Sequence, residues 1–174
     1  IADAIVLCRT AVRRIAAGLG YHATFMSRPQ GTDGASTGWH LHQSLTDLTT
    51  GAGAFVPETP GTTLSLVGSS YLGGLLAHAG GAAVFTTPTV NGYKRYQPNS
   101  LAPDRIAWGI DNKGAMVRAV GGVGDPATRL ENRSGEPAAN PYLYIASQLI
   151  SGVDGIERGL IPPAPTTDPY RTDA

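Results

Sequence analysis

The chain has 174 residues, of which 41% are hydrophobic and 15% charged, and its formal net charge is zero. This composition excludes a disordered protein, and the charge balance argues against a nucleic-acid partner, because nucleic-acid binders normally carry a basic excess. Cys8 is the only cysteine, which rules out an internal disulfide and fits a reducing, cytoplasmic compartment. The length predicts one domain or a piece of a larger one.

The N-terminal part predicts a helix, a strand and a polar loop, in that order. The helix is amphipathic and ends at Gly18 and Gly20. Its apolar stripe consists of Ile5, Cys8, Val12, Ile15 and Leu19. Residues 21–26 are rich in β-forming side chains and predict a strand, whereas residues 29–37 are polar and predict a loop.

Residues 38–45 have the period of a β-strand and carry two histidines. The sequence Gly-Trp-His-Leu-His-Gln-Ser-Leu places His40, His42 and Ser44 on one face and mainly apolar residues on the other. Taken alone, this pattern is more typical of a half-buried strand with solvated histidines. A functional site is favoured because residues 128–133 also alternate, and they stack charged side chains on one face, namely Arg129, Glu131 and Arg133.

The middle of the chain is unusually apolar. Residues 59–93 contain no formally charged side chain, and residues 64–85 are long enough to span a bilayer. Paired serines and glycines interrupt this run, so we expect no membrane partner but a buried helix followed by a short strand. Thr62 or Thr63 caps this helix, and Gly80-Gly81 ends it. Its buried stripe is Leu64, Val67, Tyr71 and Leu75.

The C-terminal half predicts three strands, a helix and a tail. The strands occupy residues 105–110, 115–120 and 128–133, and a hairpin turn at residues 111–114 joins the first two. Asn140 and Pro141 mark a helix start, and the expected buried stripe is Leu143, Ala146, Ile150 and Val153. Residues 161–174 are proline-rich and expected to be extended or mobile. Interspersed helices and strands predict the α+β class.

Several cationic side chains gather near the histidine-bearing strand in this arrangement. The charges of three arginines repel one another unless an anion or a carboxylate lies between them. These are Arg118, Arg129 and Arg133, and Glu131 can neutralise only one of them. The alternative is a surface ion-pair network that contributes little energy. Together with the histidines, the pattern favours an anion site with a hard cation. Glu131 and imidazole suit Mg²⁺ or Mn²⁺ better than a structural zinc, although the ligand set is incomplete.

Four blocks in this order resemble the catalytic domain of the glutamine synthetase family, and its middle part in particular. They are residues 38–45, residues 91–95 (Asn-Gly-Tyr-Lys-Arg), residues 102–118, and a stretch from Arg129-Leu130-Glu131-Asn132-Arg133 through residues 137–142 to residues 152–156. The resemblance covers most of residues 1–160 and implies a fragment with antiparallel strands and packed helices. Residues 161–174 form the tail outside it.

The resemblance implies an ATP-dependent ligase: ATP phosphorylates the side chain of glutamate, and an amine then displaces the phosphate. By position, His40 and Glu131 resemble ligands of Mg²⁺ or Mn²⁺. Residues that resemble ATP contacts are His42, Ser44, Lys113, Arg118 and Arg129. Residues that resemble glutamate contacts are Ser36, Gly38, Arg95 and Arg133, and the implied catalytic residues are Arg95, Arg118 and Arg133. The family assembles into rings, so a homo-oligomer is implied for the full-length protein.

Three departures from the family pattern bear on the substrate. Leu101 stands where glutamine synthetases carry a glutamate that receives a proton from ammonium, Lys113 replaces a phosphate-contacting arginine, and Ala35-Ser36 replaces an Asn-Gly pair. We therefore expect an organic amine or polyamine as acceptor. A true glutamine synthetase that uses ammonia, or a non-catalytic nucleotide-binding relative, remains the alternative. The family's other acidic metal ligands are absent, so this segment alone is expected to be inactive.

Overall fold

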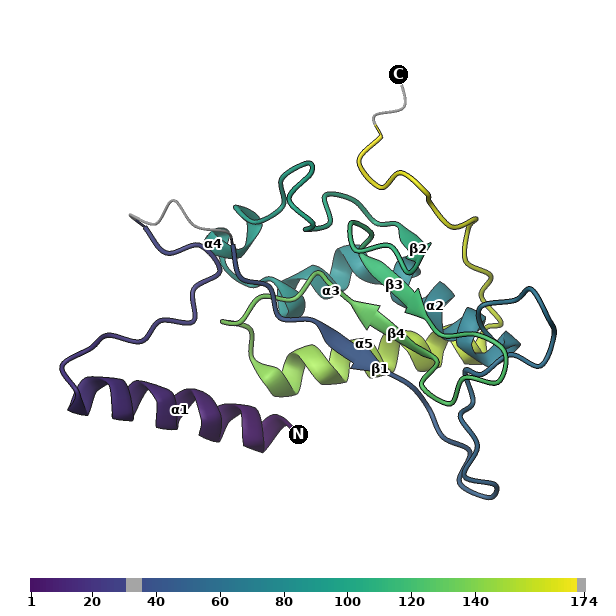
Figure 1. Cartoon of the computed structure of the whole chain (residues 1–174), viewed down its shortest axis with the longest axis horizontal. Helices are drawn as coiled ribbons and strands as arrows, with labels where there is room; N and C mark the ends of the chain where they lie inside the picture. The colour runs from purple at the N-terminus through teal and green to yellow at the C-terminus, as the bar shows by residue number, and fades with distance from the viewer. Residues whose placement is uncertain (31–35, 172–174) are drawn as a thin grey trace.

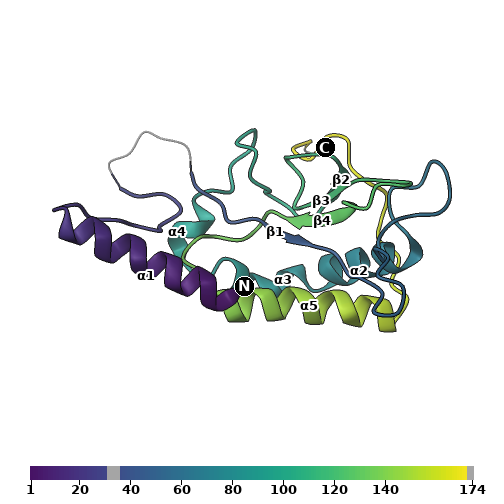
Figure 2. The ribbon, with the colours of Figure 1, turned by 60° about the horizontal axis from the view of Figure 1, so that its bottom comes forward.

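A computed structural model describes residues 1–30 and 36–171, which form a small sheet backed by helices. The strands are β1 (Leu41–Gln43), β2 (Trp108–Ile110), β3 (Val117–Val120) and β4 (Arg129–Asn132), in the order β1-β4-β3-β2. The helices are α1 (Ala2–Gly18), α2 (Leu66–Ala77), α3 (Ala79–Thr86), α4 (Val90–Tyr93) and α5 (Pro141–Glu157). Helices α2, α3 and α5 lie under one face of the sheet, and α1 extends to the side (Figures 1 and 2). The α+β class is confirmed.

The sheet register differs from the prediction at one edge. β1 pairs with β4 and β4 with β3 in antiparallel fashion, but β2 and β3 are parallel, so the predicted hairpin at residues 111–114 is wrong. A short return is possible because β2 has three residues and spans only about 10 Å. The six residues 111–116 can reach about 20 Å, which is enough to bring the chain back to the start of β3.

The helices α2 and α5 pack against each other at glycines. A Cβ on Gly155 would lie 2.2 Å from the carbonyl oxygen of Ser70, and one on Gly74 would lie 2.0 Å from that of Ser151. The buried face of α5 carries polar side chains and glycines in place of aliphatic ones, and it includes Tyr144, Gln148, Ser151, Gly152 and Gly155. The predicted apolar stripe of α5 is wrong, since Leu143 and Ile150 are 51% and 69% exposed.

The helix boundaries of the apolar middle region also differ from the prediction. Ser65, rather than Thr62 or Thr63, caps α2 by accepting a hydrogen bond from the amide of Gly68 at 3.0 Å. Helix α2 ends at Ala77, and α3 continues through Gly80-Gly81, in place of the expected stop and strand. Nothing lies within 4 Å of a Cβ built at either glycine, and neither has a positive φ, so both fit a helix.

The N-terminal segment is less embedded than its pattern predicts. Helix α1 forms, but none of its residues is buried, and Ile15 is 64% exposed. Residues 21–26 form no strand, so that prediction is wrong. Arg9 attaches α1 to the body by donating to the carbonyl oxygen of Ala139 at 2.7 Å and by stacking on Trp39.

A contiguous hydrophobic core lies between the sheet and the helices. It includes Phe55, Leu72, Leu75, Val117 and Leu130. No helix among residues 1–30 and 36–171 is long and apolar enough to cross a membrane. Apolar side chains on the helix-facing side of the sheet pack in this core, and polar residues occupy the opposite face.

Candidate functional site

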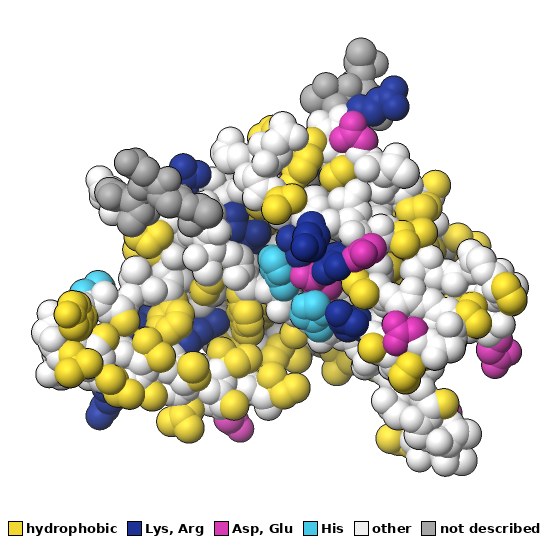
Figure 3. Space-filling view, in the orientation of Figure 1, with side chains coloured by type: hydrophobic (Ala, Val, Ile, Leu, Met, Phe, Trp, Pro, Cys, Tyr) yellow, Lys and Arg dark blue, Asp and Glu magenta, His cyan; other side chains and the backbone are white. Residues whose placement is uncertain are grey.

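Glu131 is the centre of a charged cluster on the open face of the sheet. The register places His42 opposite Glu131 on one neighbouring strand and Arg118 opposite it on the other. Its Oε1 lies 2.9 Å from His40 Nδ1 and 2.6 Å from Arg133 Nη1, and its Oε2 lies 3.0 Å from Arg118 Nη1. His42 Nε2 is 3.8 Å from Oε1. The expected juxtaposition of His40, Glu131 and Arg133 is present, and Figure 3 shows the cluster at the middle of this face.

The surroundings set the charges of the two central groups. Burial alone would raise the pKa of Glu131, but the hydrogen bond from Arg118 and the charge of Arg133 lower it below its ordinary value. Burial, followed by the charge of Arg133, lowers the pKa of His40 to about 4. At neutral pH, Glu131 is thus a carboxylate and His40 a neutral imidazole, which is the protonation state that a metal ligand needs.

Two further arginines extend the cluster along the sheet. Arg118 also forms an ion pair with Asp111, and this contact, ahead of the charge of Lys113, lowers the pKa of Asp111. Arg129 donates from Nε to His42 Nδ1 at 3.1 Å and from Nη1 to the carbonyl oxygen of Ala127 at 2.9 Å. The sequence pattern missed Asp111 as a site residue, because an aspartate followed by asparagine looked like part of a turn.

A cavity of about 450 Å³ opens beside the cluster and collects the residues predicted to contact glutamate. Ser36, Gly38, Arg95 and Arg133 all line it, together with Leu101. Gly38 is required by close approach, since a Cβ there would lie 2.9 Å from Arg95 Nη1. Ala35 of the predicted Ala35-Ser36 departure lies outside the described residues.

The two arginines of this cavity are buried and only partly paired. Arg95 is 4% exposed and uses Nη2 to donate to the carbonyl oxygens of Arg133, Ser134 and Gly135 at 2.9, 3.0 and 3.0 Å. Arg133 is 6% exposed and donates from Nη2 to the carbonyl oxygen of Leu101 at 3.1 Å. The Nε atoms of both are buried without an acceptor among the described residues. Guanidinium groups that line a cavity favour an anionic ligand.

The backbone that presents Arg95 is fixed by a buried acid that the sequence pattern did not reveal. Glu136 is fully buried, and its carboxylate accepts hydrogen bonds at 2.8 Å from both the amide and the hydroxyl of Thr89. Thr89 caps α4, and Arg95 follows that helix by two residues. Glu136 lies between a glycine and a proline, and this sequence context does not indicate burial. Its role is therefore visible only in the folded structure.

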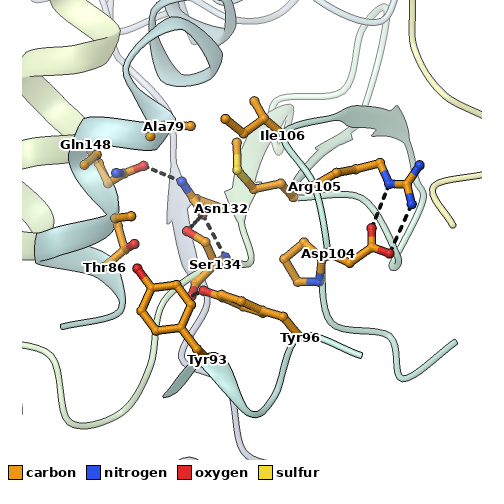
Figure 4. Close-up of a pocket in the computed structure, with 15 residues that line it drawn as sticks. Ala79, Thr86, Tyr93, Tyr96, Asp104, Arg105, Ile106, Asn132, Ser134 and Gln148 are labelled. Carbon is orange, nitrogen blue, oxygen red and sulfur yellow. Dashed lines mark hydrogen bonds and ion pairs between the residues drawn. The ribbon is translucent and has the colours of Figure 1, made fainter. Parts of the chain in front are cut away.

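The strand β4 separates this cavity from a second one of about 300 Å³ on the helix side. Asn132 and Ser134 line the second cavity with Tyr96, whereas their sequence neighbours Arg133 and Arg95 line the first. Figure 4 shows the mainly apolar second cavity, with Asn132 bonded to Gln148. Neighbouring polar residues along the chain thus line opposite cavities, because successive side chains point to opposite sides.

Two predicted ATP contacts, Ser44 and Lys113, lie apart from the cluster, and few side chains are available as ligands for a cation. Ser44 and Lys113 are exposed, the first after β1 and the second between β2 and β3. Across the described part of the chain, no group of three or more His, Cys, Asp or Glu side chains is placed to hold a metal ion. His40 and Glu131 therefore place two candidate metal donors side by side, and they do not by themselves form a metal site.

Comparisons with known proteins agree on one family. The family model "Glutamine synthetase, catalytic domain" matches residues 1–173. A γ-glutamylanilide synthase from Acinetobacter sp. is 56% identical over 158 residues, which cover 90% of this chain and 31% of that protein. A glutamine synthetase from Thermus thermophilus is 43% identical over 167 residues (94% of this chain, 36% of that protein). A glutamate–isopropylamine ligase from Pseudomonas sp. is 41% identical over 165 residues (94% and 35%). The chain spans about a third of the length of these relatives.

Proposed function

The chain belongs to the glutamine synthetase catalytic-domain family, and on this premise we propose that the full-length protein is an ATP-dependent ligase that joins the γ-carboxylate of glutamate to an organic amine. The observation that carries the proposal is the cavity lined by two largely buried guanidinium groups, those of Arg95 and Arg133. A dicarboxylic amino acid matches such a site, because guanidinium groups bind carboxylates through paired hydrogen bonds.

The reaction has two steps, and this chain supplies charge to both. The γ-carboxylate attacks the terminal phosphorus of ATP and forms γ-glutamyl phosphate with release of ADP; the amine then attacks the acyl carbon, phosphate leaves, and the amine loses a proton. Phosphoryl transfer depends on positioning and charge neutralisation. Arg95 and Arg133 hold glutamate in the cavity. The side chains that would contact ATP are His42, Ser44, Lys113, Arg118 and Arg129.

A divalent cation fits the site in part. His40 and Glu131 would contribute an imidazole nitrogen and a carboxylate oxygen, and the remaining ligands would come from outside these residues. Mg²⁺ or Mn²⁺, when bound, neutralises charge on the phosphate oxygens. Glu131 is already held by Arg118 and Arg133, which fixes its carboxylate in place.

Leu101 supports an organic amine rather than ammonium as the acceptor. It lines the glutamate cavity, and its side chain is apolar where an ammonium site needs a negative charge to bind the cation and take its proton. Relatives named γ-glutamylanilide synthase and glutamate–isopropylamine ligase carry amine acceptors in their names. The acceptor of the present protein is proposed to be of this apolar class.

The test compares acceptors with the full-length enzyme. Phosphate release is followed with ammonium, ethanolamine, putrescine, isopropylamine and aniline at equal, subsaturating concentrations, for the wild type and for Leu101→Glu. Leu48→Glu is the matched control, since Leu48 is fully exposed and lies outside the cavity. We expect an organic amine to give the highest kcat/KM and Leu101→Glu to shift the preference toward ammonium. A wild type that prefers ammonium would show that the protein is a glutamine synthetase.

A further inference from the structure

The C-terminal segment 161–171 is attached to the edge of the sheet next to β2. The amide of Thr166 donates to the carbonyl oxygen of Trp108 at 2.8 Å, and the indole Nε1 of Trp108 donates to the carbonyl oxygen of Pro163 at 2.7 Å. Farther along, Asn112 donates from Nδ2 to the carbonyl oxygen of Thr167 at 3.3 Å. In Figure 1 the segment leaves the end of α5 and passes beside β2. We call residues 161–171 the C-terminal strap.

The far end of the strap holds the loop that carries Leu101. The hydroxyl of Tyr170 donates to the carbonyl oxygen of Ala102 at 3.0 Å, and Arg105 donates from Nη1 to the carbonyl oxygen of Arg171 at 2.5 Å. Arg105 in turn pairs with Asp104 at 2.8 Å, as Figure 4 shows. Residues 100–105, which we call the acceptor loop, are thus tied to the strap at two points.

Tyr170 is seated tightly in this position. Gly114 lies beneath it, and a Cβ on this glycine would be 2.6 Å from Pro169 Cγ and 2.9 Å from the ring of Tyr170. Burial raises the pKa of Tyr170, followed by the effect of the charge of Asp104, so its hydroxyl remains a hydrogen-bond donor at neutral pH.

The acceptor loop needs such support because Leu101 is strained. Its φ is +57°, a left-handed conformation that costs a non-glycine residue on the order of 1 kcal/mol. The two carbonyls that follow this strained torsion are both held, that of Leu101 by Arg133 at 3.1 Å and that of Ala102 by Tyr170. Release of one carbonyl lets the backbone rotate toward an ordinary φ and moves the Leu101 side chain.

We propose that Tyr170 is a positioning residue for the amine acceptor site, and that it acts by holding the acceptor loop in the conformation that directs Leu101 into the cavity. This inference rests on the proposed function, in which Leu101 contacts the amine. Arg133 ties the same loop to the glutamate site, so Tyr170 and Arg133 together set the position of the amine relative to the acyl carbon. Tyr170 itself does not line the cavity.

The test uses the full-length enzyme and removes one oxygen atom. Tyr170→Phe keeps the ring against Gly114 and deletes the hydrogen bond to Ala102. Tyr142→Phe is the matched control, because it deletes a tyrosine hydroxyl that bonds Asp3 on α1, away from the acceptor loop. The hydrogen bond is worth about 1 kcal/mol, so we expect hydrogen exchange across residues 100–105 and the KM for the organic amine to rise about fivefold. The KM values for ATP and glutamate should change less than twofold.

Thr166→Pro provides a second variant, since it removes the amide that joins the strap to Trp108. It should also raise the KM for the amine selectively. Unchanged exchange at residues 100–105 in Tyr170→Phe, or equal increases in all three KM values, would overturn the proposal. A wild type that prefers ammonium would refute the proposed function alone, because the exchange measurement still reports whether Tyr170 holds the loop.

Discussion

Glu136 offers a direct test of how the fold supports the glutamate cavity. Its carboxylate is the acceptor for the amide and the hydroxyl of Thr89, both at 2.8 Å, in a fully buried position. Glu136→Ala removes both bonds and leaves the partly buried amide of Thr89 without this acceptor. Hydrogen bonds to a charged group contribute about 1.5–3 kcal/mol each, and an unsatisfied buried donor costs about 1–3 kcal/mol. Since these terms overlap, we expect local opening of residues 89–95 to become easier by about 3 kcal/mol.

Hydrogen exchange measures this opening directly in the full-length protein. A change of about 3 kcal/mol corresponds to roughly a hundredfold faster exchange at the amides of residues 89–95. Because Arg95 ends this segment and lines the cavity, the KM for glutamate should rise along with the exchange rate. Glu58→Ala is the control, as Glu58 is exposed. If Glu136→Ala exchanged no faster than Glu58→Ala, the buried carboxylate would not hold α4, and the reasoning would be refuted.

Three further outcomes are expected. Gly155→Ala should lower stability by about 3 kcal/mol or more in thermal unfolding, because its Cβ would meet the carbonyl of Ser70 at 2.2 Å, whereas Gly80→Ala, with open space around it, should be neutral or stabilising. The hydrogen bond from His78 and the contact with Arg158 lower the pKa of Asp154, so its carboxylate should stay ionised at neutral pH and be protonated only as acid titrates it through that lowered pKa; His78→Ala should raise this pKa in an NMR titration. The isolated 174-residue chain should bind 8-anilinonaphthalene sulfonate, self-associate and bind Mg²⁺ weakly by calorimetry; robust ATP-dependent hydroxamate formation by it would contradict the incomplete cation site.

The open face of the sheet was predictable because strand geometry is local. Side chains alternate along a strand, so residues two positions apart lie on the same face. This placed His40 with His42, and Glu131 with the residues two positions before and after it, independently of the rest of the fold. The helix start at Asn140-Pro141 was equally local, and Asn140 does accept from the amides of Tyr142 and Leu143. The sequence indicated which residues could meet, although their assigned roles toward ATP, glutamate and a cation remain predictions.

The tertiary partners of the helices could not be read from periodicity. In α5 most aliphatic residues, such as Leu143 and Ile150, are on the exposed side, and the closest approach to α2 is at the small residues Ser151, Gly152 and Gly155, because two helices approach this closely only where side chains are short. Hydrophobic periodicity therefore selected the wrong face. The parallel pairing of β2 and β3 was missed for a related reason: a turn-like sequence predicts a reversal but not which strand the chain joins afterwards.

The charge of the cluster fits the proposal that one site binds an anionic substrate and a cation. Four guanidinium groups, from Arg95, Arg118, Arg129 and Arg133, surround the two carboxylates of Glu131 and Asp111, and His40 is neutral. The cluster thus carries an excess of positive charge, which attracts carboxylate and phosphate and repels a free divalent cation. A cation can join only together with anionic ligands, which in the proposed function are ATP and carboxylates of the full-length protein. The same excess explains why Glu131 is buried yet remains ionised, and why ATP and the cation should bind to the full-length protein cooperatively.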